Sequence, residues 1–320
     1  MDVTRKRIAV TGGSGFLGRH LIDRLRAVGC EEICAPSHDE LELRERSAIE
    51  HWLARERPEL VFHLAARVGG IGANQREPAT FLYDNLIMGV ELIEAARRAD
   101  VEKMVVVGTV CCYPKHTPVP FREEELWNGY PEETNAPYGL AKKLLMVQLD
   151  AYRQQFGFQG VSPILVNLFG PGDDFDPRSS HVIPALIRRF EEARLDGAPS
   201  VTVWGSGRAT REFLYVEDAA RALVLAAERL DSPEPVNVGS GEEISIAELA
   251  RTIARLAGYR GKILFDPSKP DGQPRRRLDI TRARERMGFE ALVSLEEGLE
   301  RTIEWYRAQG AARTTTSLLA

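Results

Sequence analysis

The sequence has few cysteines and no long apolar run, and both absences narrow its class. Its four cysteines are Cys30, Cys34, Cys111 and Cys112, and the last two are adjacent and would form a disulfide only with strain. No spacing of cysteine with histidine indicates zinc, so we expect neither a disulfide framework nor a bound metal. No stretch is apolar enough to cross a membrane, and no signal-peptide segment precedes the first expected strand. We therefore expect a cytoplasmic protein with no membrane partner.

Basic residues are not in excess either. The chain of 320 residues has 42 Lys and Arg against 47 Asp and Glu, a formal net charge of −5, so nothing favours a nucleic acid as partner. An apolar fraction of 43% and a charged fraction of 28% are ordinary for a globular protein. The length leaves room for two lobes or for one large α/β unit. Composition therefore does not indicate a function, which must be inferred from the sequence motifs.

The first motif is a glycine-rich turn between an expected strand at residues 7–11 and a helical pattern that continues to Ala27. Small residues in such a turn let the backbone approach a pyrophosphate, which then lies at the positive N-terminal end of the helix. The alternative is a glycine turn without a ligand, but its place between strand and helix favours a dinucleotide. The predicted binding residues are Gly12, Gly13, Ser14, Gly15, Phe16, Leu17 and Gly18.

The second expected strand, residues 32–35, indicates which dinucleotide binds. In such folds an acid after this strand contacts the ribose of NAD, whereas a cation accommodates the extra phosphate of NADP. Ser37 and His38 follow the strand and offer a hydroxyl and an imidazole, with no acid before Asp39. This favours NADP(H), with Ser37 and His38 among its contacts.

Strands and helices alternate along the first half of the chain. Apolar strands are expected at residues 60–66, 101–107 and 161–166, and helices at 79–99 and up to about 156. This order predicts an α/β fold with a Rossmann-type, doubly wound parallel sheet. His63 lies inside one apolar strand and is interpreted as a core residue. After residue 170 the pattern changes to polar loops, short strands and helices, the clearest at 216–228, 236–238, 246–257 and a last helix ending near 307.

A hydroxyl, a phenol and an amine form a second motif. Thr109 follows an apolar strand, and Tyr138 and Lys142 are four residues apart, so they share one face of a helix. An ammonium close to a phenol favours the phenolate and lowers its pKa, which suits the pair to proton transfer. Alone, this spacing more often reflects a half-buried tyrosine and a solvated lysine. The glycine motif and the alternating elements favour the catalytic interpretation.

From about residue 7 to residue 307 the sequence resembles the extended short-chain dehydrogenase/reductase family, and within it the branch that forms GDP-L-fucose. The general motifs of the family are residues 11–18, the Thr109 region, and Tyr138 with Lys142. The narrower motifs lie at residues 68–71, 111–115, 180–187, 203–207 with 211–213, and 269–272. The resemblance implies a Rossmann-type domain with a smaller, discontinuous C-terminal substrate lobe, and a homodimer that pairs two long helices of each subunit.

The resemblance also implies the reaction, which is NADPH-dependent 3,5-epimerisation and 4-reduction of a GDP-linked 4-keto-6-deoxy sugar, GDP-4-keto-6-deoxy-D-mannose. The ketone at C4 acidifies the protons at C3 and C5. In the family a cysteine matching Cys111 removes these protons and a histidine matching His181 returns them on the opposite face. Tyr138 then protonates the C4 oxygen, while Lys142 lowers the pKa of that phenol and Thr109 hydrogen-bonds the carbonyl oxygen.

Other binding residues follow from the same resemblance. Further NADP contacts are implied at Leu64, Ala65, Ala66, Lys142, Leu165, Asn167, Leu168 and His181, and contacts to the GDP sugar at Val68, Gly69, Arg189, Trp204, Arg211 and Asp271. The run of three arginines at 275–277 is interpreted as a solvated face. Residues 1–170 are expected to form the NADP-binding domain, with parts of 213–240 packing back onto it. Residues 171–310 should mainly form the nucleotide-sugar lobe, and 311–320 a disordered tail.

Some residues depart from the family pattern. Val110 stands where the family has a second serine and Cys112 where it has a branched aliphatic residue, the loop at 172–175 lacks a His-Asn pair, and the His38 region lacks an arginine. A related GDP sugar, of the colitose or heptose type, or an enzyme with only one half of the chemistry therefore stays an alternative. A silent NADP-binding protein is disfavoured because Cys111, Tyr138, Lys142 and His181 are all present.

Overall fold

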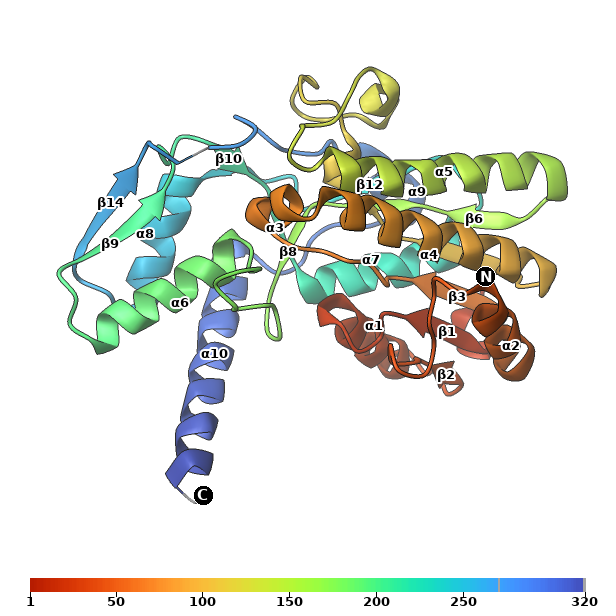
Figure 1. Cartoon of the computed structure of the whole chain (residues 1–320), viewed down its shortest axis with the longest axis horizontal. Helices are drawn as coiled ribbons and strands as arrows, with labels where there is room; N and C mark the ends of the chain where they lie inside the picture. The colour runs from red at the N-terminus through yellow and green to blue at the C-terminus, as the bar shows by residue number, and fades with distance from the viewer. Residues whose placement is uncertain (270, 319–320) are drawn as a thin grey trace.

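A parallel β-sheet organises the first half of the chain (Figure 1). The computed structural model describes residues 1–269 and 271–318. Five parallel strands pair in the order β2-β1-β3-β4-β6, which is the doubly wound arrangement predicted. Their bounds are β1 Ile8–Thr11, β2 Ile33–Cys34, β3 Leu60–His63, β4 Lys103–Val106 and β6 Gln159–Val161.

The sheet continues through two strand breaks. β5 (Gly108–Thr109) follows β4 after one residue, and β7 (Pro163–Leu165) follows β6 after Ser162. β7 pairs in parallel with β5 on one side and with β12 (Val236–Val238) on the other. The hydroxyl of Ser162 donates to the carbonyl of Val106, 3.0 Å away, so the break itself is hydrogen-bonded. The single strand predicted at 161–166 is therefore divided in two.

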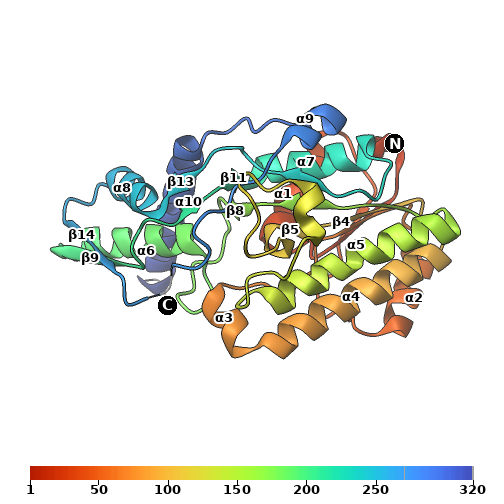
Figure 2. The same ribbon diagram turned by 90° about the horizontal axis from the view of Figure 1, so that it is seen from above.

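Helices cover both faces of this sheet. On one face α1 (Phe16–Ala27) packs against α7 (Val216–Arg229). On the other lie α2 (Arg46–Glu56), α4 (Pro78–Arg98) and α5 (Ala136–Phe156), and Figure 2 shows the long helices α4 and α5 side by side. Apolar side chains fill both interfaces, which explains why the strands read as continuous apolar runs. Shorter elements are η1 Val3–Arg5, α3 Ile71–Arg76, η2 Val110–Cys112 and η3 Glu123–Trp127.

A second group of elements has its own apolar core and lies at the left of Figure 1. β8 (Asn167–Phe169) pairs with β11 (Phe213–Tyr215), β9 (Ser200–Trp204) with β14 (Lys262–Asp266), and β10 (Thr210–Arg211) with β13 (Ile244–Ser245). The helices of this lobe are α6 Val182–Leu195, α8 Ile246–Ala257 and α10 Leu295–Leu318.

The chain returns to the first core after entering the second. Side chains of α7, β12 and α9 (Thr281–Met287) belong to the core around β1. The predicted return of parts of 213–240 agrees with this packing. The helix α9 has no counterpart among the predicted elements, because its seven residues are too few to show a period and include three arginines. It is held by Ala283 and Met287, which are buried in that core.

The C-terminal helix differs from the sequence prediction. Residues 311–320 were expected to form a disordered tail, but α10 continues to Leu318. The segment contains no proline, so nothing in it prevents the hydrogen-bonded turns that begin at Leu295 from continuing. Residues 319 and 320, and Pro270 of the motif at 269–272, lie outside the described residues. In the described part of the chain, no helix is long and apolar enough to cross a membrane.

Candidate active site

The glycine turn is shaped by close backbone approach. Gly12 has φ +76°, in the left-handed region, and a Cβ placed there would lie 2.7 Å from the backbone nitrogen of Ala65. A Cβ on Gly18 would lie 2.1 Å from the carbonyl oxygen of Gly12. α1 begins at Phe16, and within residues 1–269 no side chain caps its N-terminus. The turn therefore presents backbone N–H groups at the positive end of a helix, which fits a pyrophosphate.

The residues after β3 lie against the same turn. The backbone nitrogen of Leu64 donates to the carbonyl of Thr11, 3.1 Å away, so the segment of Leu64, Ala65 and Ala66 begins beside the glycines. Farther on, the amide of Asn85 on α4 holds the backbone of Arg67 through bonds of 2.9 and 3.0 Å. These two hydrogen bonds, which the sequence did not predict, fix the backbone that leads into Val68 and Gly69. Val68 is 57% exposed and faces solvent.

The loop after β2 contains an acid that sequence analysis did not weigh. The backbone nitrogen of Ser37 donates to a carboxylate oxygen of Glu40 at 2.8 Å, and hydrogen bonds from Ser37 lower the pKa of Glu40. His38 is exposed beside it. A negative charge thus lies next to the two residues predicted to contact the NADP phosphate.

Thr109, Tyr138 and Lys142 meet where β5 reaches the first turn of α5. The Thr109 hydroxyl caps the 3₁₀ turn η2 by accepting from the backbone nitrogen of Cys111 at 3.3 Å. A Cβ on Gly139 would lie 2.3 Å from the carbonyl oxygen of Cys111, so only glycine lets α5 approach η2 this closely. Tyr138 hydrogen-bonds Thr109 and lies in electrostatic contact with Cys111. The predicted hydroxyl, phenol and thiol are therefore brought together.

The electrostatics of this group differ from the expectation in one respect. Burial raises the pKa of the Tyr138 phenol, Cys111 and Cys112 raise it further, and the hydrogen bond with Thr109 opposes them. Lys142 is only 3% exposed, and burial lowers its pKa to about 8, against an opposing effect of Cys112. Lys142 is not among the groups that shift Tyr138, so the predicted lowering of the phenol's pKa is wrong for this arrangement. Desolvation of the buried phenol is the largest effect on the pKa of Tyr138.

Cys111 has a cationic neighbour that the sequence placed in solvent. Arg276 is 8% exposed, and its Nη1 lies 3.7 Å from the sulfur of Cys111. The prediction of a solvated face at 275–277 is therefore wrong for Arg276. It agrees with Arg275, whose half-exposed side chain pairs with Glu243. Adjacent residues of like charge therefore lie in different environments here, with Arg275 exposed and Arg276 buried.

His181 stands at the N-cap of α6 and is exposed. Although part of its surface reaches solvent, the imidazole is packed among enough protein atoms to lower its pKa, and the charge of Asp174 opposes this. The backbone nitrogen of Gly70 donates to the carbonyl of Ser179 at 3.1 Å, which places His181 close to the loop that carries Val68 and Gly69. Among the described residues no hydrogen bond joins His181 to Cys111.

The loop that leads to α6 is anchored on α1. The side chain of Arg19 donates to the carbonyl of Gly172 at 3.2 Å, and Nε2 of His20 donates to the carbonyl of Pro171 at 2.8 Å. Burial raises the pKa of Asp173 in this loop to about 7. The sequence gave no sign of these contacts, because they join residues about 150 positions apart.

Cationic and aromatic groups predicted to hold the nucleotide sugar gather in the second lobe. The Arg189 guanidinium lies over the ring of Trp204, 5.5 Å from its centroid, and Trp204 is 62% exposed. The Asp271 carboxylate accepts from the backbone nitrogen of Ser206 at 2.6 Å and from its hydroxyl at 2.7 Å. Asp271 thereby fixes its own loop beside Trp204.

Arg211 joins this group to Cys111. Its Nη1 donates to the carbonyls of Thr210 and Gln273 at 2.7 and 2.6 Å, and its Nη2 donates to the carbonyl of Asp271 at 3.1 Å. Burial and, to a smaller extent, the charge of Arg276 lower its pKa to about 10. Two guanidinium groups are therefore held near one sulfur atom.

The remaining predicted NADP contacts lie on β7 and β8. Leu165 is buried in the core, whereas Asn167 and Leu168 are partly exposed. The Asn167 side chain donates to the carbonyl of Glu212 at 2.9 Å, so β8 is tied to the strand that follows Arg211. Because the side chain of Leu165 is buried, a ligand could contact Leu165 only through its backbone.

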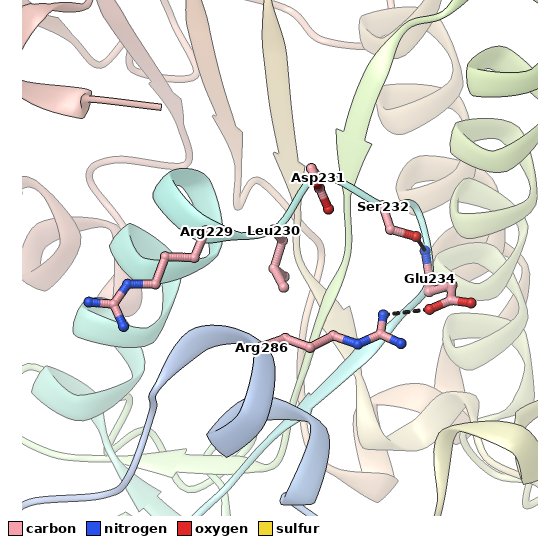
Figure 3. A pocket seen from close by; sticks show the side chains of 6 residues that line it. All are labelled: Arg229, Leu230, Asp231, Ser232, Glu234 and Arg286. Carbon is pink, nitrogen blue, oxygen red and sulfur yellow. Dashed lines mark hydrogen bonds and ion pairs between the residues drawn. The ribbon is translucent and has the colours of Figure 1, made fainter.

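A cavity elsewhere in the molecule contains none of the predicted site residues. It is lined by the end of α7, the following turn and Arg286 of α9, and in Figure 3 Arg286 points toward Glu234, with which it forms an ion pair of 2.5 Å. Its remaining lining residues are Arg229, Leu230, Asp231 and Ser232. Arg286 and Glu234 pair with each other and Arg229 donates to the carbonyl of Met287 at 2.6 Å, so this cavity is separate from the cluster around Cys111.

Comparison with known proteins identifies the group to which this arrangement belongs. Residues 8–239 match the model of the NAD dependent epimerase/dehydratase family. The chain belongs to this family. It is 44% identical over 299 residues to a GDP-L-fucose synthase of Sinorhizobium fredii, covering 93% of this chain and 95% of that protein. It is 41% identical over 313 residues to the GDP-L-fucose synthase of Escherichia coli, covering 95% and 97%.

More distant matches include enzymes named for other GDP-linked sugars as well as a further fucose synthetase. A GDP-L-colitose synthase of Yersinia pseudotuberculosis is 35% identical over 303 residues, with 94% of this chain and 97% of that protein covered. A GDP-6-OMe-4-keto-L-xylo-heptose reductase of Campylobacter jejuni superposes with a TM-score of 0.91 at 27% identity, over 96% and 99% of the two chains. A GDP-L-fucose synthetase of Naegleria fowleri bound to NADP gives 0.85 at 28% identity, over 95% and 94%.

Proposed function

We propose that this protein is an NADPH-dependent 3,5-epimerase and 4-reductase that converts GDP-4-keto-6-deoxy-D-mannose to GDP-L-fucose. The observation that carries the proposal is the cluster in which Cys111 lies beside Thr109 and Tyr138, with a buried guanidinium at 3.7 Å from its sulfur. A base next to a phenol that can protonate a ketone oxygen suits both halves of this reaction. The resemblance to fucose synthases over more than nine-tenths of the chain supports it.

Epimerisation needs a base and an acid on opposite faces of the sugar ring. The Cys111 thiolate would take the proton from C3 or C5, and the electron pair of the broken C–H bond would move into an enolate whose charge lies on the C4 oxygen. Thr109 and Tyr138 are placed to donate hydrogen bonds to that oxygen. His181 would then protonate the same carbon from the other face and restore the ketone. The thiol returns its proton to solvent and the imidazole regains one.

Reduction uses the same oxygen. When bound, NADPH supplies hydride to C4. Tyr138 would protonate the resulting alkoxide, and its raised pKa suits it to hold a proton until the alkoxide forms. Lys142, buried one helical turn away, would hold the nicotinamide ribose. The glycine turn with Leu64–Ala66 and the loop of Ser37 and His38 would bind the rest of the dinucleotide, with Leu165, Asn167 and Leu168 at the nicotinamide end.

The GDP sugar would extend from this cluster into the second lobe. Arg189 and Arg211 would neutralise the diphosphate, Trp204 would flank the nucleotide, and Asp271 would fix the loop that covers it. Val68 and Gly69 would contact the sugar from the loop after β3. On this basis residues 1–170 form the NADP-binding domain and residues 171–310 mainly the nucleotide-sugar lobe.

We further propose that the protein is a cytoplasmic homodimer built on α4 and α5. Exposed apolar side chains on these two helices support this arrangement, namely Leu82 and Tyr83 on α4 and Leu144 and Val147 on α5. A face of this kind is unusual on a monomer and typical of an interface.

Turnover in deuterated water tests the function. With NADPH and GDP-4-keto-6-deoxy-D-mannose, we expect oxidation of NADPH together with deuterium at C3 and C5 of the product, measured by absorbance and NMR. Deuterium without loss of NADPH would reduce the function to epimerisation. The Cys111→Ser variant should bind NADPH normally but lose deuterium incorporation by a factor of about 100 or more. Normal turnover by this variant would disprove the assignment of the base.

A colitose-type substrate is a second candidate. Val110 is buried directly before Cys111, where the family's second serine would offer a hydroxyl. A sugar that lacks a hydroxyl beside the reacting ketone would lose nothing there, and a colitose synthase is among the relatives. A higher kcat/KM with the 3-deoxy substrate than with the fucose precursor would favour this candidate.

A further inference from the structure

Arg276 reaches Cys111 through a chain of three side-chain contacts. The amide nitrogen of Gln273 donates to the carbonyl of Lys115 at 2.8 Å, and the amide oxygen of Gln273 accepts from Nε of Arg276 at 3.2 Å. Nη1 of Arg276 then lies 3.7 Å from the Cys111 sulfur. Gln273 and Arg276 are 6% and 8% exposed. The Arg276 guanidinium is therefore anchored, through Gln273, to the backbone of Lys115 in the segment that follows Cys111.

This buried guanidinium has no carboxylate partner within residues 1–269 and 271–318. Its neighbour Arg275 pairs with Glu243, whereas the contacts of Arg276 are an amide oxygen and a sulfur atom. A buried charge is costly unless an opposite charge lies near it. The sulfur of Cys111, 3.7 Å from Nη1 of Arg276, can supply one, because a thiol becomes an anion by losing its proton.

A second cation near the sulfur of Cys111 makes a negative charge there still more favourable. Arg211 also lies in electrostatic contact with Cys111, and Arg276 and Arg211 repel each other. The donors of Arg211 are already directed at the carbonyls of Thr210, Gln273 and Asp271. Arg276 is thus the cation with a donor aimed at the sulfur. Tyr138 and Cys112 are also in electrostatic contact with Cys111.

We infer that Arg276 is a positioning residue that holds the sulfur of Cys111 as a thiolate aimed at the sugar, an inference that rests on the function proposed above. A thiolate is the form of cysteine that accepts a proton, and an adjacent arginine favours it. Nothing is consumed in this step: the thiol proton passes to solvent, and the charge left on sulfur is balanced by the guanidinium.

Alkylation of Cys111 tests the inference without any substrate. The cysteine thiolate attacks the methylene carbon of iodoacetamide and displaces iodide. Peptide mass spectrometry separates the product at Cys111 from the products at the other three cysteines. In Arg276→Gln we expect the alkylation rate near neutral pH to fall about tenfold or more, because a hydrogen bond to a charged group is lost. The rate should recover as the pH rises, since hydroxide then forms the thiolate. Arg276→Lys, which keeps the charge, should recover part of the wild-type rate.

The matched control is Arg275→Gln, which removes the neighbouring charge from an exposed position and should leave the alkylation rate unchanged. Equal rates for wild type and Arg276→Gln would overturn the inference. So would weaker binding of GDP by Arg276→Gln with an unchanged rate, because Arg276 would then be a ligand of the diphosphate only. If Arg276→Gln does not fold, Gln273→Ala removes the anchor and should slow alkylation by itself, and an unchanged rate would again overturn the inference.

Turnover separates this inference from the proposed function. If the wild-type protein does not epimerise or reduce the GDP sugar, the proposed function fails whatever the alkylation rates are. If it does, Arg276→Gln should lose kcat for deuterium incorporation about tenfold or more, with little change in KM. A loss confined to KM would count against a positioning role.

Discussion

The phenol of Tyr138 separates the two halves of the reaction. Tyr138→Phe removes the proton donor for the C4 alkoxide but leaves Cys111 and Thr109 in place. We expect NADPH oxidation to fall by a factor of about 100 to 10,000, the usual contribution of a positioned acid. Deuterium should still enter C3 and C5, which NMR of the recovered substrate would show. Equal loss of both activities would mean that Thr109 alone cannot support the enolate oxygen and that epimerisation depends on the phenol as much as reduction does.

Lys142 gives the enzyme a pH dependence near its own pKa. Burial lowers that pKa from 10.5 to about 8, so the ammonium is lost as the pH rises through about 8. We expect the KM for NADPH to increase above this pH, because the ammonium no longer holds the ribose. The Lys142→Met variant should have a higher KM at every pH and no such transition. A wild-type KM that stays constant across this range would contradict the prediction.

The lowered pKa of Lys142 also makes the free energy of unfolding depend on pH. The folded pKa of Lys142 lies below the value of 10.5 expected when unfolded, so between about 8 and 10.5 the unfolded chain binds a proton that the folded chain does not. The free energy of unfolding should therefore contain a contribution that rises with pH across this window and is lost as the pH falls. Denaturant titrations of wild type and Lys142→Met should differ by this slope.

At the scale of elements, Gly139 sets the distance between α5 and η2. Gly139→Ala would place a Cβ 2.3 Å from the carbonyl oxygen of Cys111, so the backbone must move apart. We expect a loss of about 1–3 kcal/mol in the free energy of unfolding and a decrease in activity. Gly72→Ala on α3 is the control, since its Cβ would meet only the end of the Arg76 side chain at 3.4 Å. Equal effects of the two substitutions would show that the close approach is unimportant.

Elements with local signals were predictable from the sequence. The helix α8 matches its prediction because Ser245 and Glu248 form a capping box and Gly258 ends the helix in the left-handed conformation. β12 also matches its prediction. The helix α9 was missed because it is stabilised by packing and its sequence shows no helical period. The glycine turn and the Thr109–Tyr138 cluster were foreseen. Arg276, Glu40 and Asn85 were not, because their roles depend on which distant segments the fold brings beside them.

For the whole molecule, the exposed faces of α4 and α5 predict an association of two copies. Leu144→Glu combined with Val147→Glu places charges on this face, at positions that are 47% and 46% exposed. We expect a dimer to become a monomer, measured by sedimentation equilibrium. Leu292→Glu alters an apolar residue that is 73% exposed in another region and should leave the mass unchanged. A wild-type protein that sediments as a monomer would exclude this dimer.

The hydrogen bonds from Arg19 and His20 to the loop at residues 171–172 join the dinucleotide turn to the segment that carries His181. A pyrophosphate bound at the start of α1 would steady this helix, and with it the approach of the imidazole to the sugar. NADP would then act as a structural element in a half-reaction that consumes no reducing equivalent. The oxidised dinucleotide, which has no hydride to give, should still accelerate deuterium exchange at C3 and C5.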